Sequence, residues 1–246
     1  LRVPGTESSL QHVKAHGAKV RIVYSPADAL KEAQRHPDLR VVFLGVGFET
    51  TAPTVAWTIK EAADTGQANY SALCAHKTMP NAMAALLSGG EVRIDGFMCP
   101  GHVSMIIGSD AYQFICRDYE RPCVVAGFEP EDMIIGIEML LRQLVEGRAE
   151  VENQYTRAVT ADGNPAARAG IDAVFEPADV EWRGLGVIPD SGLAIREEFA
   201  AHDAGRLFAD LDVPAPKENR GCICGDVLRG ARTPLDCKLF TRACTP

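Results

Sequence analysis

The sequence predicts an α/β fold in which parallel sheets and their helices surround a cleft. Short apolar runs alternate with segments of helical character along the first 150 residues, which is typical of parallel sheets. Each unusual polar loop follows directly after an apolar run, and such loops gather at the carboxyl edge of parallel strands, where ligands bind. The 246 residues, 46% of them hydrophobic, are ample for a buried core.

The first 150 residues contain five expected strand–helix pairs. The strands are the apolar runs at 20–24, 41–46, 71–75, 94–98 and 123–126. The helices that follow them cover 26–35, 54–65, 82–87, 109–118 and 130–146. Ser25 and Pro26 suit a helix start as N-cap and first helical residue. The run at 41–46 is apolar without interruption, which predicts a buried parallel strand.

The remaining residues have weaker patterns. We expect helix or strand at 150–159, a strand interrupted by glycines at 181–188, a helix at 193–203 and a stiff linker at 214–217. The expected organisation has four parts. They are the remainder of a first α/β domain at 1–25, an α/β domain at 26–150, its α/β continuation at 151–213 and a cysteine-rich segment at 214–246.

Composition and charge exclude several classes of protein. The net charge of -8 is unfavourable for sequence-independent nucleic-acid binding, which needs a basic face. No apolar run approaches the roughly 20 residues that span a bilayer. The first residues lack the layout of a secretory signal. We therefore expect a cytoplasmic protein without membrane or nucleic-acid partners, in which clustered cysteines bind metal or carry redox chemistry.

Four polar loops are the candidate cleft residues, at 47–51 (GFETT), 76–81 (HKTMPN), 99–102 (CPGH) and 127–132 (GFEPED). Glu49 and Glu129 occur in repeated GFE sequences, where the glutamate either binds a polar ligand or caps a helix. In CPGH, a thiol near an imidazole makes Cys99 and His102 candidates for nucleophilic or ligating roles. The alternative is a loop cysteine beside a histidine that bonds to the backbone.

Half of the eight cysteines lie near the end of the chain. Cys222, Cys224, Cys237 and Cys244 form a dense thiol set that indicates a metal or cluster site. Zinc sites commonly use C-x-x-C pairs, which are missing here, whereas uneven gaps suit a cubane cluster. Spacing alone leaves both open. Cys74, Cys116 and Cys123 occur in apolar runs and are expected to be buried structural residues.

Taken together, these motifs resemble the HypD family of hydrogenase maturation proteins. The matching stretches are R-V-P-G (2–5), G-F-E-T-T-A-P (47–53), C-P-G-H-V-S (99–104), G-F-E-P-x-D (127–132) and the cysteine pattern of 222–246. They follow in order along essentially the whole chain. The family's C-G-G-H and G-P-G-C-P-V-C motifs are missing, so the resemblance implies a fragment that lacks them and the extreme C-terminus.

The resemblance also implies a function. Family members serve as scaffolds for assembly of the Fe(CN)2CO group of [NiFe] hydrogenases, together with HypC and HypE. Carried over, a [4Fe-4S] cluster would be held by Cys222, Cys224, Cys237 and Cys244. Glu49, Cys99, His102 and Glu129 would position a transient iron with its CN and CO ligands, whose own thiol ligands are not in this chain. The alternatives are an α/β binding module with a structural zinc or cluster, and a thiol hydrolase using Cys99 and His102.

Overall fold

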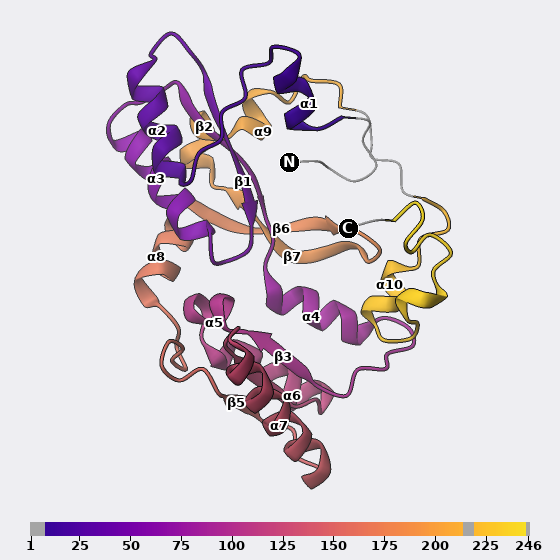
Figure 1. Ribbon diagram of the computed structural model, residues 1–246. Helices are drawn as coiled ribbons and strands as arrows, with labels where there is room; N and C mark the ends of the chain where they lie inside the picture. Colours follow the sequence, from indigo (N-terminus) through magenta and orange to yellow (C-terminus); the bar gives the residue numbers. More distant parts are fainter. Residues whose placement is uncertain (1–7, 214–218, 245–246) are drawn as a thin grey trace.

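The computed structural model describes residues 8–213 and 219–244 and has an α/β fold with two parallel sheets, as predicted (Figure 1). β1 and β2 form one parallel pair, and β3, β4 and β5 form a second parallel sheet. β6 and β7 form an antiparallel hairpin. The strands are β1 (Val41–Gly47), β2 (Tyr70–His76), β3 (Phe97–Pro100), β4 (Cys123–Ala126), β5 (Val151–Asn153), β6 (Phe175–Trp182) and β7 (Gly186–Ile195).

The helices connect and cover these strands. The α-helices are α1 (Leu10–Ala15), α2 (Pro26–Arg35), α3 (Ala52–Asp64), α4 (Met79–Ser88), α5 (Gly101–Ile107), α6 (Gln113–Tyr119), α7 (Pro130–Glu146), α8 (Pro165–Val174), α9 (Ala204–Leu207) and α10 (Cys224–Leu228). The 3-10 helices are η1 (Ser109–Tyr112), η2 (Glu197–His202) and η3 (Pro234–Asp236). No helix in the described ranges is long and apolar enough to cross a membrane.

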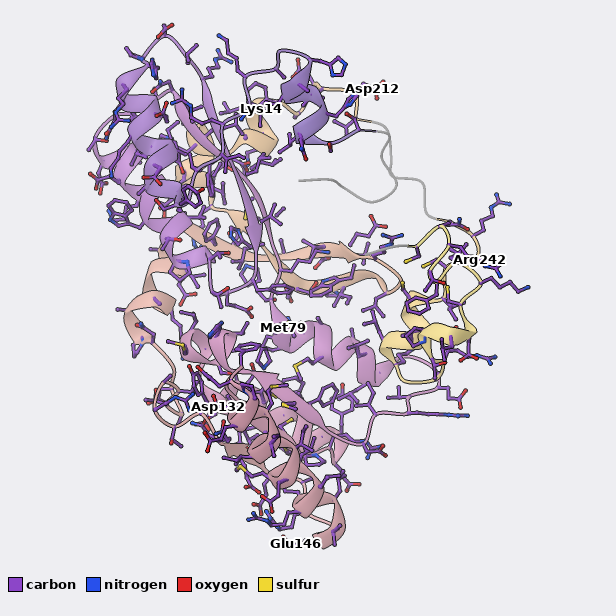
Figure 2. All side chains as sticks on the ribbon, in the orientation of Figure 1. Lys14, Met79, Asp132, Glu146, Asp212 and Arg242 are labelled. Atoms are coloured by element: carbon purple, nitrogen blue, oxygen red, sulfur yellow. The ribbon has the colours of Figure 1, made fainter. Side chains whose placement is uncertain are left out.

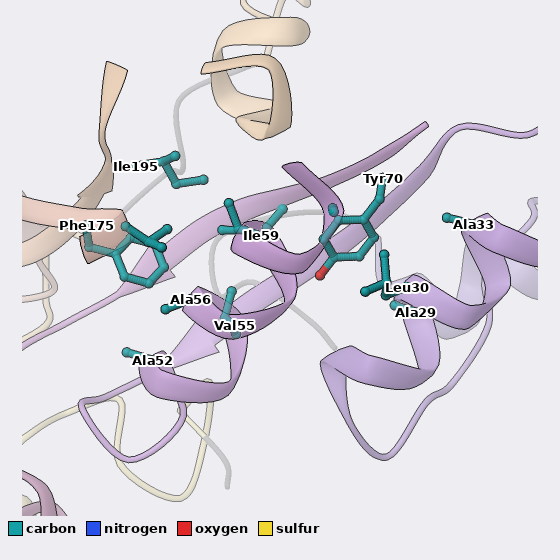
Figure 3. Packing of buried hydrophobic residues seen from close by; sticks show 13 residues of the cluster. Ala29, Leu30, Ala33, Ala52, Val55, Ala56, Ile59, Tyr70, Phe175 and Ile195 are labelled. Carbon is teal, nitrogen blue, oxygen red and sulfur yellow. The ribbon is translucent and has the colours of Figure 1, made fainter. Parts of the chain in front are cut away.

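Two hydrophobic cores divide the molecule into two lobes (Figure 1). The first lobe is built on β1 and β2, and its core joins α2 and α3 to the base of the hairpin. Figure 3 shows Ile59 and Val55 of α3 packed among Leu30, Tyr70 and Phe175. The second lobe is built on β3, β4 and β5, and its core includes Met83 of α4. The helix α4 therefore leaves the first sheet and packs in the second lobe.

Several elements agree with expectation at the level of single residues. α2 begins at Pro26 and ends at Arg35, and the Ser25 hydroxyl accepts a hydrogen bond from the Asp28 amide at 3.3 Å. α7 ends before Gly147, which adopts φ +66. β2 and β4 contain the expected runs at 71–75 and 123–126. The expected helix at 109–118 is divided into η1 and α6, and 150–159 contains the short strand β5.

Other expectations were wrong. Residues 20–24 form no strand, because the ladder partners that a strand requires are missing among the described residues. β1 is parallel as predicted, but Val42 and Val46 are exposed rather than buried. The expected strand at 181–188 is strand at both ends, but residues 183–185 form the turn that joins β6 to β7, so it is a hairpin and not one continuous strand. The expected helix at 193–203 begins as strand, because Ile195 pairs with Phe175. Residues 214–217 lie outside the described residues.

Candidate functional site

Glu49 is the best-defined polar residue of the predicted loops. β1 and β2 end side by side, with Gly47 opposite His76, so the GFETT and HKTMPN loops leave adjacent strand ends. Glu49 is only 4% exposed, and its Oε1 accepts a hydrogen bond from the Met79 amide at 2.8 Å. Its buried Oε2 has no hydrogen-bond partner in the described structure. Burial raises the pKa of this carboxyl group above its ordinary value.

Phe48, Lys77 and Trp182 form a cluster beside Glu49, called here the Trp182–Lys77–Phe48 corner. Phe48 lies 6.2 Å from the ring of Trp182 at the end of β6, and the Lys77 ammonium lies 4.7 Å from the same ring. The Lys77 ammonium also donates to the Glu181 carbonyl. The Trp182 indole donates to Ser191 at 2.8 Å, which fixes the ring. Sequence analysis missed Trp182 because it follows Phe48 by 134 residues and reaches it only through the pairing of β6 with β7.

The CPGH motif separates its two reactive side chains. Cys99 is 1% exposed and belongs to the core of the second lobe, whereas His102 lies on the surface of α5 with its ring 4.5 Å from Phe128. No hydrogen bond joins Cys99 to His102, so this geometry gives no support to the thiol-hydrolase hypothesis. The His102–Phe128 contact brings the CPGH and GFEPED loops together. This agrees with the expectation from the sequence, because these loops follow the adjacent parallel strands β3 and β4.

Tyr112 is a fully buried phenol in the core that contains Cys99. The Tyr112 hydroxyl bonds to Ser104 of α5 at 3.0 Å. Burial, followed by the charges of Cys99 and Glu49, raises the pKa of this phenol. Cys99 and Tyr112 both belong to the core of the second lobe.

The buried cysteines behave as predicted in two of three positions. Cys116 and Cys123 are buried in the second core. Their mutual hydrogen bond, together with burial, raises the pKa of Cys116. Cys74 is half-buried, and its thiol bonds to the Leu193 carbonyl at 3.1 Å. Burial raises the pKa of Cys74 to about 11, which makes its thiol unreactive at neutral pH.

An ion-pair network fixes the GFEPED loop at the start of α7. Asp132 is 4% exposed and accepts hydrogen bonds from Arg157 at 2.7 Å and Gln154 at 2.9 Å. Arg157 also pairs with the exposed Glu129 at 2.9 Å and stacks 4.4 Å from the Tyr155 ring. Figure 2 shows Asp132 in the second lobe. Glu129 is therefore part of a structural ion-pair network. The buried acid at the centre of this network is Asp132, which was not among the residues selected from the sequence.

The four terminal cysteines lie in the segment 219–244 beside α4 (Figure 1). The Cys222 and Cys224 thiols share a hydrogen bond, which raises the pKa of Cys224. The Cys237 thiol accepts backbone hydrogen bonds from Leu239, Ile223 and Phe240, which lower its pKa. The Cys237 thiol thus contacts Ile223, the residue between Cys222 and Cys224, and the Cys244 amide donates to the carbonyl of Leu239, two residues after Cys237, at 2.9 Å. These backbone contacts bring the turns that carry the four cysteines together.

The four terminal thiols are the donor set of the segment 219–244. All eight cysteines are free. Within residues 8–213 and 219–244, no three His, Cys, Asp or Glu side chains are placed to hold a metal ion. Four neighbouring thiols on loops and a single short helix nevertheless fit the donor chemistry of an iron–sulfur cluster, whose corners are farther apart than the ligands of one zinc ion.

Comparison with known proteins decides the family. The family model HypD, described as "Hydrogenase formation hypA family", matches residues 1–246. The chain belongs to the HypD family. Curated relatives named "Hydrogenase maturation factor HypD" include those of Cupriavidus necator, 50% identical, Azotobacter vinelandii, 51% identical, and Escherichia coli, 46% identical. Each alignment covers 100% of this chain and 66–67% of the relative, so the chain spans about two thirds of those HypD proteins.

Proposed function

We propose that this chain acts in the maturation of [NiFe] hydrogenases, as part of a scaffold on which the Fe(CN)2CO group is assembled. The observation that carries this proposal is the match to the HypD family along all 246 residues. The relatives bear the name of hydrogenase maturation factors and share up to 51% of aligned residues. The partners proposed with it are a HypC-type chaperone and a HypE-type cyanide donor, and the proposed compartment is the cytoplasm, where thiols stay reduced.

The proposed resident cofactor is a [4Fe-4S] cluster on Cys222, Cys224, Cys237 and Cys244. Two features support it: backbone contacts bring the turns that carry the four cysteines together, and backbone amides donate to the Cys237 thiol, which favours its thiolate form. When bound, such a cluster supplies electrons for thiol redox or ligand attachment. Cys224 begins α10 and Cys237 caps η3, whereas Cys222 and Cys244 lie in the loops beside them.

The proposed iron cargo is positioned by the loops around Glu49 and His102. Glu49 offers a buried carboxylate oxygen without a partner, and His102 offers an exposed imidazole. Cys99 and Glu129 are proposed in supporting roles, Cys99 from inside the second core and Glu129 through Arg157. The thiol ligands of the cargo iron belong to motifs that this sequence does not contain.

Metal analysis after anaerobic purification tests the cofactor. The proposal expects about four iron and four sulfide per chain, with the absorbance of a cubane cluster. Replacing Cys237 with serine should remove most of the bound iron, whereas replacing the buried Cys116 with serine should leave the iron content unchanged. Finding zinc without sulfide would overturn the proposed [4Fe-4S] cofactor and favour a binding module with a structural metal.

Hydrogenase activity in cells tests the cargo site. A full-length family member in which Glu49 is replaced by glutamine, or His102 by alanine, should lose most of its ability to mature hydrogenase. The matched control is Glu131→Gln, which changes an exposed acid in the first turn of α7. Unchanged maturation in the Glu49 or His102 variant would remove that residue from the proposed site.

A further inference from the structure

The turn of the β6–β7 hairpin lies directly against the cysteine segment, residues 219–244. Gly184 in this turn has φ +77, and a Cβ added to it would lie 2.9 Å from the Gly225 amide nitrogen and 3.3 Å from the Cys224 Cβ. A Cβ added to Gly225 would collide with the Gly184 carbonyl oxygen. Gly225 is buried although its segment is largely exposed. Two glycines therefore allow backbone to meet backbone beside Cys224.

A second contact ties the same segment to the connection between α4 and β3. The Arg93 amide donates to the Arg229 carbonyl at 2.8 Å. Gly230, with φ +72, lies so close to the Arg93 carbonyl that a side chain there would collide with it. The cysteine segment is therefore held between the hairpin of the first lobe and the connection that enters the second lobe, as its position in Figure 1 shows.

The other part of the hairpin contacts the loops near Glu49. The Thr78 amide donates to the Ser191 carbonyl at 2.8 Å, and the Asn81 amide group donates to the Asp190 carbonyl at 2.8 Å. Trp182, two residues before Gly184, lies against Phe48 and Lys77. One two-stranded element thus contacts the cysteine segment at its turn and the loop after β2 along its length.

We propose that Gly184 and Gly225 are positioning residues, which seat the cysteine segment on the hairpin and couple its position to the Trp182–Lys77–Phe48 corner beside Glu49. The contact is made by backbone atoms packed without intervening side chains, so a shift of the segment moves the turn. The hairpin transmits that shift through Ser191. Its hydroxyl accepts a hydrogen bond from the Trp182 indole, and its carbonyl accepts one from the Thr78 amide. This coupling concerns the protein alone and holds whichever metal group the thiols bind.

The fluorescence of Trp182 tests the coupling from the cysteine segment to the hairpin. The chain has two tryptophans, so Trp57→Phe leaves Trp182 as the sole reporter. In that background Gly225→Ala should shift the Trp182 emission maximum to the red, as the corner opens to water. Gly221→Ala is the matched control, because it lies in the same segment with only ordinary contacts at 3.5 Å or more. Equal spectra for the two variants would overturn the proposal.

Hydrogen exchange tests the coupling in the reverse direction. Gly184→Ala should accelerate amide exchange in residues 220–230 by about tenfold, which corresponds to ~1.4 kcal/mol of local stability. Gly186→Ala carries the same backbone strain, since Gly186 also has φ +77, but nothing lies within 4 Å of an added Cβ. Equal exchange rates for these two variants would overturn the proposed packing of the cysteine segment on the hairpin turn. If Gly184→Ala does not fold, unprotected amides at residues 224–230 of the unmodified protein would overturn it instead.

Discussion

Two buried carboxylates near the polar loops have opposite electrostatic environments. Glu49 has one hydrogen-bond donor and an unpartnered oxygen, and burial raises its pKa. Asp132 is equally buried, but its hydrogen bonds, foremost the one from Arg157, lower its pKa. A carboxylate that is buried without a cation is unfavourable for stability and suits ligand binding, whereas one paired with arginine stabilises the fold.

Replacing Glu49 with glutamine is therefore expected to stabilise the protein at neutral pH. The raised pKa means that the folded chain binds this proton more tightly than the unfolded chain. Stability is then lost as pH rises from the ordinary value of 4.5 through the raised value. Glutamine keeps an acceptor for the Met79 amide and carries no charge. Urea unfolding at pH 4 and pH 7 measures the difference between variant and wild type. A gain that is larger at pH 4 than at pH 7 would contradict this assignment.

The Asp132–Arg157 pair should behave in the opposite way. Because its pKa is lowered, ionised Asp132 adds stability above pH 3.8, and this contribution is lost as pH falls through the lowered value. Arg157→Met should destabilise the chain at pH 7 by leaving Asp132 buried without its cation. A double-mutant cycle with Asp132→Asn isolates the interaction. If the two single losses simply add in the double variant, the two side chains are not coupled.

At the scale of elements, α7 and α8 each contain one glycine within the helix, and the two glycines have different surroundings. Gly136 in α7 faces β4, and a Cβ there would lie 2.9 Å from the Ala126 Cβ. Gly170 in α8 has no atom within 4 Å of an added Cβ. Both sit inside helices, where glycine costs about 0.5–1 kcal/mol relative to alanine. Only packing distinguishes them.

Alanine at these two positions should therefore have effects of opposite sign. Gly170→Ala should raise the free energy of unfolding by about 0.5–1 kcal/mol, because the helix gains propensity without a collision. Gly136→Ala should lower it by about 1–3 kcal/mol, because α7 is pushed away from β4. Denaturant unfolding measures both values. Stabilisation by Gly136→Ala would show that α7 does not pack closely on the sheet.

The sequence predicted elements whose signals are local, and it failed where distant pairing decides. Ser25, Pro26 and Gly147 marked α2 and α7 correctly because caps act within one turn. The hairpin was missed because cross-strand pairs such as Phe175 with Ile195 have no local signature. The same distinction holds in the site: the loop motifs selected Glu49, whereas Arg157 and Trp182 reach their partners only through tertiary structure.

At the scale of the whole molecule, the cysteine segment is a bridge between the lobes. It meets the first lobe at Gly184 and the entry to the second lobe at Arg93, while α4 joins the lobes through Met79, labelled in Figure 2. A segment attached only by its chain would bind metal independently of the rest. When the segment is packed on both sides, metal binding to it stabilises the folded state of the whole chain.

Loading the thiols should accordingly stabilise the entire protein. When ferrous and ferric iron with sulfide load the thiols so that filled chains outnumber empty ones about 100 to 1, the stabilisation is ~2.7 kcal/mol. For about 250 residues, each kcal/mol raises Tm by about 2–4 °C. The measurement is anaerobic circular dichroism at a wavelength dominated by the helices, which lie mostly outside residues 219–244. Cys237→Ser should abolish the shift, and iron without sulfide should reproduce little of it. An unchanged helical transition in the loaded wild type would mean that the segment is tethered and not docked.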